Sequence, residues 1–152
     1  MKIPYVAAGA EIDGAYRYSL WRRWSTAAAP GSVLFVMLNP STADAYADDP
    51  TIRRCMGFAR SWGYGGIMVG NLFAFRAADP RNDVVLGNLA RAADLIVCAW
   101  GAHRMVTRRA PAVIELLRRI GHPHYLELTA TGEPRHPLYL RADLSPVPWM
   151  VA

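Results

Sequence analysis

The sequence has few cysteines, a single lysine and no long apolar run, and each shortage excludes a class of protein. The two cysteines, Cys55 and Cys98, belong to no Cys-x-x-Cys pair, so neither a zinc site nor a disulfide scaffold is expected. No apolar run approaches the roughly 20 residues that a membrane span needs. Residues 1–14 carry one lysine and then an acidic residue, which is a poor secretory signal. We therefore expect a cytoplasmic protein that uses no metal ion or other cofactor.

The charge balance is basic and comes almost entirely from arginine. The chain has 17 basic and 12 acidic residues, a formal charge of +5, and Lys2 is its only lysine. Arginine forms bidentate contacts with phosphate or carboxylate and stacks on flat rings, so an anionic partner is one interpretation. A genome rich in G and C also favours arginine codons. Composition alone does not separate these two interpretations.

The length and composition indicate one globular domain over residues 1–152. The chain is 53% hydrophobic and 19% charged, which is typical of a protein with a buried core. No repeat, low-complexity tract or linker divides it.

Apolar runs of strand length alternate with amphipathic segments of helix length. Strands are expected over residues 16–24, 33–38, 67–73, 95–100 and 125–128, with 137–140 as a further extended segment. Helices are expected over residues 50–62, 83–92 and 105–120. This alternation predicts an α/β fold: a three-layer sandwich whose mostly parallel central sheet is covered on both faces.

Polar side chains gather directly after three of the apolar runs, and a fourth group lies near the end of the chain. These groups are residues 39–44, 71–73, 100–103 and 135–139. In a parallel sheet the first three groups share the carboxyl edge, where ligand sites form. His136 in the fourth group is closely flanked by prolines that restrain the chain. Convergent polar groups beside aromatic rings suit a small-molecule pocket.

Each member of these groups also has a structural interpretation. Asn39 precedes a proline and is suited to capping a turn. The Asn71 side chain is suited to hydrogen-bonding backbone groups at the end of a strand. Phe73 and Trp100 are typical of core residues, and His103 fits the exposed start of a helix. The coincidence of four groups, more than any one residue, favours a site.

Six strings occur in order along the chain: MLNPSTAD, DDPTIRRC, GFARSWGYGG, NLFAFRA, AWGAH and HPLYL. On these strings the chain from Tyr18 to Trp149 resembles a bacterial and phage family known as a domain of unknown function, DUF1643. Members of that family usually carry a longer acidic loop with Pro and Gly after NLFAFRA. Here the segment 78–81 is abrupt, so the corresponding loop is short or missing.

The order of motifs is also similar to that of the uracil-DNA glycosylase superfamily. The matching positions are Asn39-Pro40 for the first Asn-Pro or Asp-Pro motif, Asn71 for the base-reading asparagine, Trp100-Gly101 for the end of a hydrophobic strand, and His136-Pro137 for the late His-Pro motif. Met37 stands where that first motif has glycine, and Leu138-Tyr139 stands in place of Ser-Pro. The resemblance implies a uracil-DNA-glycosylase-like fold more strongly than it implies the activity.

The resemblance implies residues for the cleavage of an N-glycosidic bond, which builds negative charge on the departing base. Asn39 would hold the attacking water and His136 would donate a hydrogen bond to a base oxygen. Asn71 would read the polar edge of a flipped base, and Phe73 would stack on its face. The other expected substrate contacts are Ser41, Trp100, His103 and Arg135, with Arg76 at the rim on phosphates.

Three functions are compatible with these residues. The leading one is a glycosylase-like protein that binds, and cleaves, a nucleobase in DNA. The second is a non-catalytic nucleotide or nucleic-acid module, which the residues at 37 and 138 favour. The third is an enzyme on a free nucleotide or another small metabolite. The acidic residues Asp44, Asp48 and Asp49 already occupy the start of the following helix, so no phosphate is expected there.

The sequence leaves the oligomeric state open. Trp21, Trp24 and Trp149 are equally suited to covering the core and to forming an interface.

Overall fold

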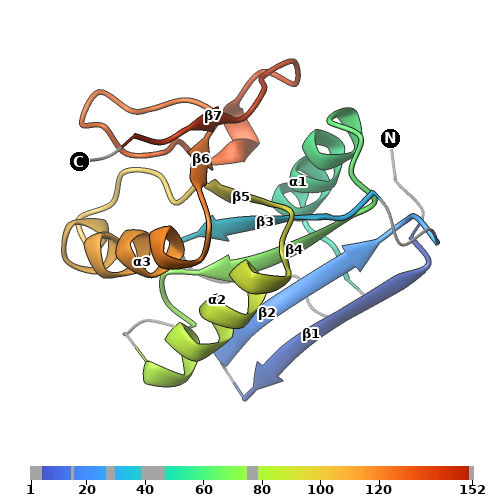
Figure 1. Ribbon diagram of the computed structural model, residues 1–152, viewed down its shortest axis with the longest axis horizontal. Coiled ribbons are helices and arrows are strands. Elements are labelled where there is room, and N and C mark those ends of the chain that lie inside the picture. The colour runs from blue at the N-terminus through green and yellow to red at the C-terminus, as the bar shows by residue number, and fades with distance from the viewer. Residues whose placement is uncertain (1–4, 15, 27–29, 39–46, 75–78, 151–152) are drawn as a thin grey trace.

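A seven-stranded sheet with helices on both faces is the centre of the structure (Figure 1). The computed structural model describes residues 5–14, 16–26, 30–38, 47–74 and 79–150. The strands are β1 (Ala7–Asp13), β2 (Tyr16–Arg23), β3 (Ser32–Met37), β4 (Gly66–Asn71), β5 (Leu95–Cys98), β6 (Pro123–Tyr125) and β7 (Val147–Pro148). The helices are α1 (Pro50–Ser61), α2 (Pro80–Ala92), α3 (Val106–Ile120) and the 3-10 turn η1 (Pro137–Tyr139).

The sheet is mixed, so the expectation of a mostly parallel sheet was wrong. The strand order is β1-β2-β4-β3-β5-β6-β7, and only the central four strands pair in parallel. A hairpin of β1 and β2 adds antiparallel strands at one edge, and β7 pairs antiparallel with β6 at the other. Gly14 closes the hairpin with a φ of 60°, a conformation that glycine adopts without strain. The Ala- and Gly-rich residues of β1 lack the alternation that marks a strand in sequence.

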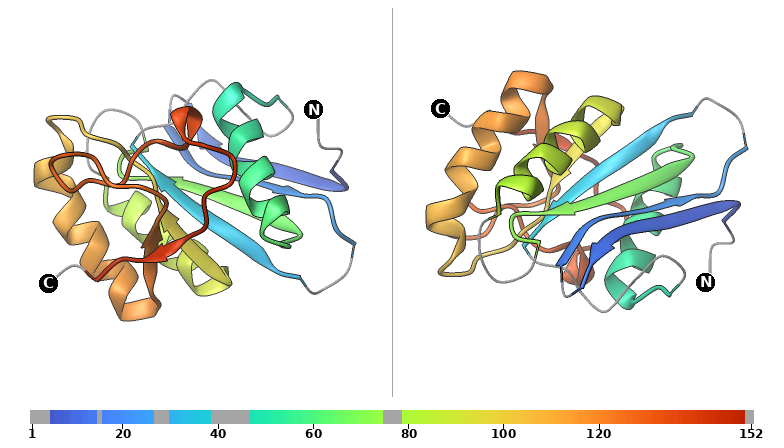
Figure 2. Two further views of the ribbon diagram at one scale, coloured as in Figure 1. Left: turned by 90° about the horizontal axis from the view of Figure 1, so that it is seen from above. Right: turned by 90° about the horizontal axis from the view of Figure 1, so that it is seen from below.

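The side chains of β3 divide the core into two clusters, one on each face of the sheet. Val33, Phe35 and Met37 pack in the cluster with α1, whereas Leu34 and Val36 pack with α2 and α3. Figure 2 shows α2 and α3 on the opposite side of the sheet from α1. Because side chains alternate along a strand, each residue at the carboxyl end of a strand faces either the α1 cluster or the cluster of α2 and α3.

Asp-Pro pairs begin both α1 and α2. The Asp49 carboxylate accepts a hydrogen bond from the backbone N–H of Ile52 at 2.8 Å, and Pro50 follows at the first helical position. Asp79 caps α2 in the same way, so that helix begins at Pro80, three residues earlier than expected.

Two of the expected extended segments near the chain end differ in the structure. The strand expected over 125–128 lies earlier, as β6 (Pro123–Tyr125). The segment 137–140 is mostly the 3-10 turn η1, which Pro137 begins. The restricted φ of proline suits the first position of a helical turn, and this outweighs the strand pattern there.

Candidate functional site

The chain connections change face at β3, and a change of this kind marks the ligand crevice of α/β proteins; we therefore call the carboxyl edge of β3 and β4 the candidate crevice. The connection after β3 leads to α1 on one face, whereas the connections after β4 and β5 lead to α2 and α3 on the other. Ligands of α/β proteins bind where neighbouring strands diverge in this way. The expected site residues Asn39 and Ser41, and Arg76 at the rim, lie outside the described residues.

Asn71 ends β4 at this crevice, and its side chain is completely buried. Neither its Nδ2 nor its Oδ1 has a hydrogen-bond partner within the part of the chain that the structure describes. Asn71 pairs in register with Met37, and the alternation of β4 places both side chains on the α1 face. A buried amide without partners is costly, which makes it the most informative group at the crevice.

The backbone carbonyls at the end of β4 accept hydrogen bonds from side chains, in contrast to the side-chain amide of Asn71. The Nδ2 of Asn82 on α2 donates to the carbonyls of Asn71 at 2.9 Å and Leu72 at 3.2 Å. The Nε of Arg109 on α3 also donates to the Leu72 carbonyl, at 2.7 Å. The buried Asn82 and Arg109 were not anticipated from the sequence. They fix the end of β4, so the Asn71 side chain is presented in a defined direction.

His136 lies directly before η1, beside the end of β5. A Cβ on Gly101, which has a φ of 75°, would lie 3.8 Å from the Cβ of His136. The Nδ1 of His136 accepts a hydrogen bond from the N–H of Leu138 at 3.3 Å. Burial lowers the pKa of His136, and the negative charge of Asp49 opposes that shift. The neutral ring therefore carries its proton on Nε2, which is then a donor.

Arg17 is a buried cation on the same face. It is 4% exposed. Burial lowers its pKa, Asp49 opposes this shift and Arg22 adds to it. A bulge produces this position: Glu11 pairs with Ser19 but Ile12 pairs with Arg17, so β2 contains one extra residue. The sequence did not single out Arg17, because no local signal reveals the bulge.

Asp49 connects these groups electrostatically, because its charge acts on both Arg17 and His136. A buried cation and a half-buried neutral imidazole thus lie within the electrostatic reach of the carboxylate that caps α1, and the buried amide of Asn71 lies on the same face of the sheet. In the sequence Asp49 was recognised only as a helix cap and as a reason against phosphate binding.

Phe73 and Trp100 are in the other cluster, between the sheet and the helices α2 and α3. Trp100 is 2% exposed, its Nε1 donates to Glu133 at 2.7 Å, and its ring lies 5.6 Å from that of Trp149. The structure therefore does not bring these two expected substrate contacts to the face that holds Asn71.

His103 and Arg135 are exposed side chains with local partners. The Nδ1 of His103 accepts from the N–H of Met105 at 3.2 Å, near the start of α3. Arg135 lies 3.6 Å from Glu127 in an ion pair that is half exposed on both sides. Such a pair contributes little to stability, so Arg135 can exchange Glu127 for another anion.

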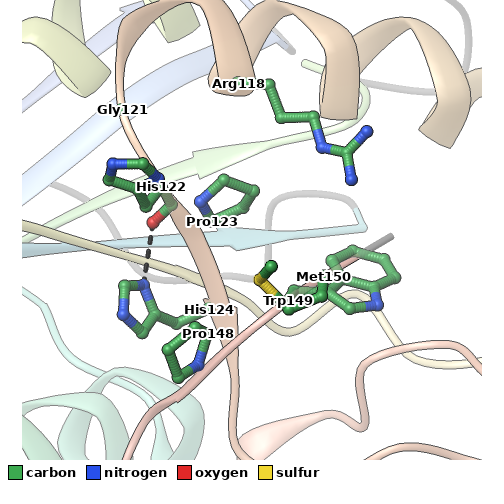
Figure 3. A pocket seen from close by; sticks show the side chains of 8 residues that line it. All are labelled: Arg118, Gly121, His122, Pro123, His124, Pro148, Trp149 and Met150. Carbon is green, nitrogen blue, oxygen red and sulfur yellow. Dashed lines mark hydrogen bonds between the residues drawn. The ribbon is translucent and has the colours of Figure 1, made fainter. Parts of the chain in front are cut away.

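A cavity of about 540 Å³ lies at the opposite edge of the sheet, at the amino end of β6. Figure 3 shows Arg118, His122 and His124 around it with Trp149, and the Nδ1 of His124 on the carbonyl of His122 at 2.8 Å. This cavity is remote from the carboxyl edge, and its polar groups come from the end of α3, the turn that follows and β6. The buried amide of Asn71, which has no partner among the described residues, is at the other edge.

The described residues were also compared with the requirements of metal sites, reactive thiols and membrane-spanning helices. Within the described ranges, no three or more His, Cys, Asp or Glu side chains gather in an arrangement suited to a metal ion. Cys55 and Cys98 are free and fully buried, and burial raises the pKa of both thiols. None of the described helices has the length and apolar character required to cross a bilayer.

The fold and the crevice define an α/β protein with a candidate ligand site at the carboxyl edge of a mixed sheet. A family model matches residues 17–138, about four fifths of the chain. The chain belongs to the family described as "Protein of unknown function (DUF1643)". Neither the curated proteins nor the solved structures contain a significant match to it.

Proposed function

We propose that the protein binds a nucleobase in this crevice and hydrolyses the N-glycosidic bond of a modified or damaged base in DNA. The observation that carries the proposal is the buried amide of Asn71, which has no hydrogen-bond partner among the residues that the structure describes. A carboxamide has two donor hydrogens and an acceptor oxygen, which are complementary to the polar edge of a base. A ligand that bonds to these atoms would remove the desolvation penalty that the free protein bears.

The charges around the crevice support a ligand group that is itself uncharged. Among the described residues, the buried Arg17 and Arg22 face the carboxylates of Asp48 and Asp49. These charges balance without a ligand. A charged group entering such surroundings would remain unpaired, whereas a neutral base would not.

The chemistry assigned to His136 agrees with its neutral state. Water attacks the anomeric carbon, the N-glycosidic bond breaks, and its electron pair leaves with the base. The Nε2–H of His136 would donate to the base oxygen that carries the developing charge, and the proton of the water passes to solvent or to the departing base. Asn39 remains the proposed residue that orients the water.

Exposed groups near His136 support contact with a DNA strand. Tyr139 is 87% exposed, and its ring lies 6.5 Å from that of His136. Arg135 and Arg141 lie on either side in the sequence, and both side chains are more than half exposed. An exposed aromatic ring between arginines is suited to stacking on a base while the cations contact phosphates.

The finer architecture is part of the proposal. Helices on both faces of the sheet and the order of the motifs support a three-layer sandwich of the uracil-DNA glycosylase type. We also propose a cytoplasmic location. Cys55 and Cys98 are free and belong to the clusters on opposite faces of the sheet, as expected for a protein of a reducing compartment.

A non-catalytic binding module is the alternative that Met37 favours. Its side chain is 4% exposed and lies in the α1 cluster at the end of β3, where the similar superfamily has glycine. The side chain of Met37 would leave less room for a base to lie against the backbone than a glycine would. Ligand binding without turnover would follow.

The test is incubation with oligonucleotides that carry uracil, hypoxanthine and alkylated or oxidised bases, followed by detection of abasic sites. We expect product from at least one substrate, and loss of it in Asn71→Leu and His136→Gln. His122→Gln at the remote cavity is the matched control and should keep activity. The complete absence of abasic product would remove the enzymatic part of the proposal.

Binding measurements separate the remaining functions. Affinity for an oligonucleotide should fall steeply with salt when several phosphates are contacted. An affinity for a free nucleoside that salt hardly changes would favour an enzyme on a small metabolite. Binding without turnover, lost in Asn71→Leu, would identify the non-catalytic module.

A further inference from the structure

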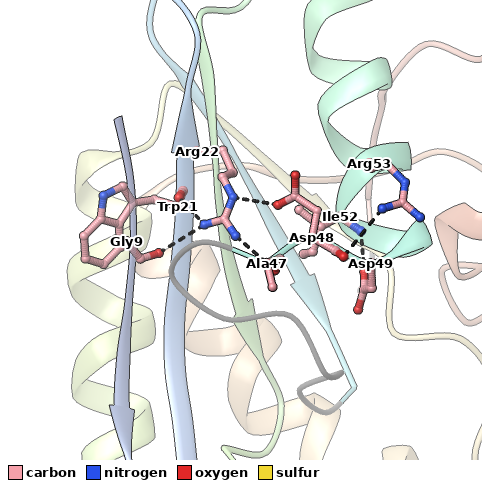
Figure 4. A network of polar contacts seen from close by, with 8 residues as sticks. All are labelled: Gly9, Trp21, Arg22, Ala47, Asp48, Asp49, Ile52 and Arg53. Carbon is pink, nitrogen blue, oxygen red and sulfur yellow. Dashed lines mark hydrogen bonds and ion pairs between the residues drawn. The ribbon is translucent and has the colours of Figure 1, made fainter. Parts of the chain in front are cut away.

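Arg22 is a fully buried arginine whose guanidinium joins three segments of the chain (Figure 4). Its Nε donates to Asp48 at 2.8 Å, and its Nη2 donates to the carbonyl of Ala47 at 3.3 Å. Its Nη1 donates to the carbonyls of Trp21 at 2.9 Å and Gly9 at 3.5 Å. The guanidinium thus connects β1 and β2 with the residues that lead into α1.

The segment that Arg22 holds ends at a residue of the crevice. Ala47 and Asp48 directly precede Asp49, whose carboxylate caps α1 through Ile52. One bond to Asp48 would neutralise the charge of Arg22; the second bond, to the adjacent Ala47, also fixes where the next residue lies. A planar guanidinium can make such bonds simultaneously, whereas a lysine ammonium cannot reproduce them.

The start of α1 is in turn packed against the segment that carries His136. Arg54 on α1 donates to the carbonyl of Leu140, directly after η1. His136 caps η1 at its other end through Leu138. The position of Asp49 relative to His136 therefore depends on how the chain enters α1.

We infer that Arg22 is a positioning residue: its bonds to Ala47 and Asp48 hold Asp49 where its carboxylate faces Arg17 and His136. That this positioning matters for ligand binding rests on the proposed function. The bonds of Arg22 themselves involve no ligand. Arg22 itself contacts neither the imidazole nor the amide of the crevice among the bonds that the structure shows.

The protonation of His136 reports on this arrangement. The ionisable groups on the segments next to it are Asp49, Arg53 and Arg54 at the start of α1, with Arg135 and Tyr139 in its own segment. Of these, Asp49 is the charge that acts on the imidazole, and it raises the pKa of His136 against the effect of burial. Displacing the carboxylate should therefore lower that pKa further.

The test is a double-mutant cycle read by NMR titration of the His136 imidazole, assigned with His136→Gln. Asp49→Asn keeps the helix cap and removes the charge, so the pKa of His136 should fall. Arg22→Lys keeps the charge and removes the planar set of donors, so the pKa should fall in the same direction. Adding Arg22→Lys to Asp49→Asn should cause no further fall, because both changes act through one carboxylate.

Arg109→Lys is the matched control on the other face of the sheet. Arg109 is 8% exposed, donates to the Leu72 carbonyl and pairs with Asp83, so its replacement also destabilises the protein. It should leave the pKa of His136 unchanged. An equal fall in Arg109→Lys, or additive falls in the double variant, would overturn the inference.

A second variant covers the case in which Arg22→Lys does not fold. Asp48→Asn preserves the shape of the partner and weakens the same anchor, and it should lower the pKa of His136 in the same direction. An unchanged pKa in a folded Arg22→Lys or Asp48→Asn protein would show that Arg22 serves stability alone. Because this titration uses no ligand, its outcome is independent of whether any oligonucleotide is bound or cleaved.

Discussion

Replacing Asn71 with leucine should make the free protein more stable, although the residue is completely buried. Leucine has the same branched arrangement of side-chain heavy atoms as asparagine but no polar atoms. Both amide atoms of Asn71 lack a partner within the described residues, so the substitution breaks no hydrogen bond there. Removing a buried polar residue usually destabilises a protein, which makes the expected sign unusual.

The magnitude follows from the desolvation of the amide. An unsatisfied buried polar group costs about 1–3 kcal/mol, and the substitution removes that penalty. We therefore expect the free energy of unfolding to rise by about 1–3 kcal/mol. For a domain of this size that corresponds to an increase in Tm of roughly 2–12 °C. A buried polar group that lowers the stability of the free protein is expected at a binding site, where function is favoured over stability.

Thermal unfolding with and without ligand checks this expectation, and Asn82→Leu is the matched control. Asn82 is equally buried, but its Nδ2 donates to two carbonyls, so its replacement should lower the Tm. A nucleobase or oligonucleotide that binds should raise the Tm of the parent protein and not that of Asn71→Leu. A decrease in Tm for Asn71→Leu as large as that for Asn82→Leu would refute the reasoning.

Three further predictions concern the core, the imidazole and the thiols. Leu117→Ala should lower the free energy of unfolding by about 2–5 kcal/mol in denaturant titrations, because the Leu117 side chain of α3 is fully buried in the core. Burial lowers the pKa of His136 in the folded state, so the unfolded chain takes up this proton first, and stability should fall as the pH drops through about 6.5. His136→Gln should reduce the change in Tm between pH 7.5 and 5.5, and an identical change in both proteins would contradict the assignment. Cys55 and Cys98, whose pKa values burial raises, should react with a thiol reagent only after unfolding.

Local sequence patterns predicted the central elements of the fold because their causes are local. The apolar run before Asn39 forms β3, and the Asp49-Pro50 pair begins α1 as expected from its capping chemistry. The spacing of apolar residues predicted α3 to within one residue. These features depend on side chains within one or two turns of each other, which a single sequence contains.

The two outermost strands, β1 and β7, could not be predicted in this way. The residues of β1 show no strong strand pattern, and β7 has only two residues. Both are strands because a neighbouring strand offers them hydrogen bonds, which is a property of the assembled sheet.

For the candidate site, the sequence by itself determined that polar residues follow the apolar strands, among them Asn71 and His136. Only the tertiary structure decided which of them share surroundings. It placed Phe73 and Trp100 in the cluster on the other face, and left the amide of Asn71 buried without a described partner. It also buried Arg17 and Arg22, which no sequence pattern had singled out. The physical reason is that a bulge or a change of face moves a side chain to other surroundings without changing any local pattern.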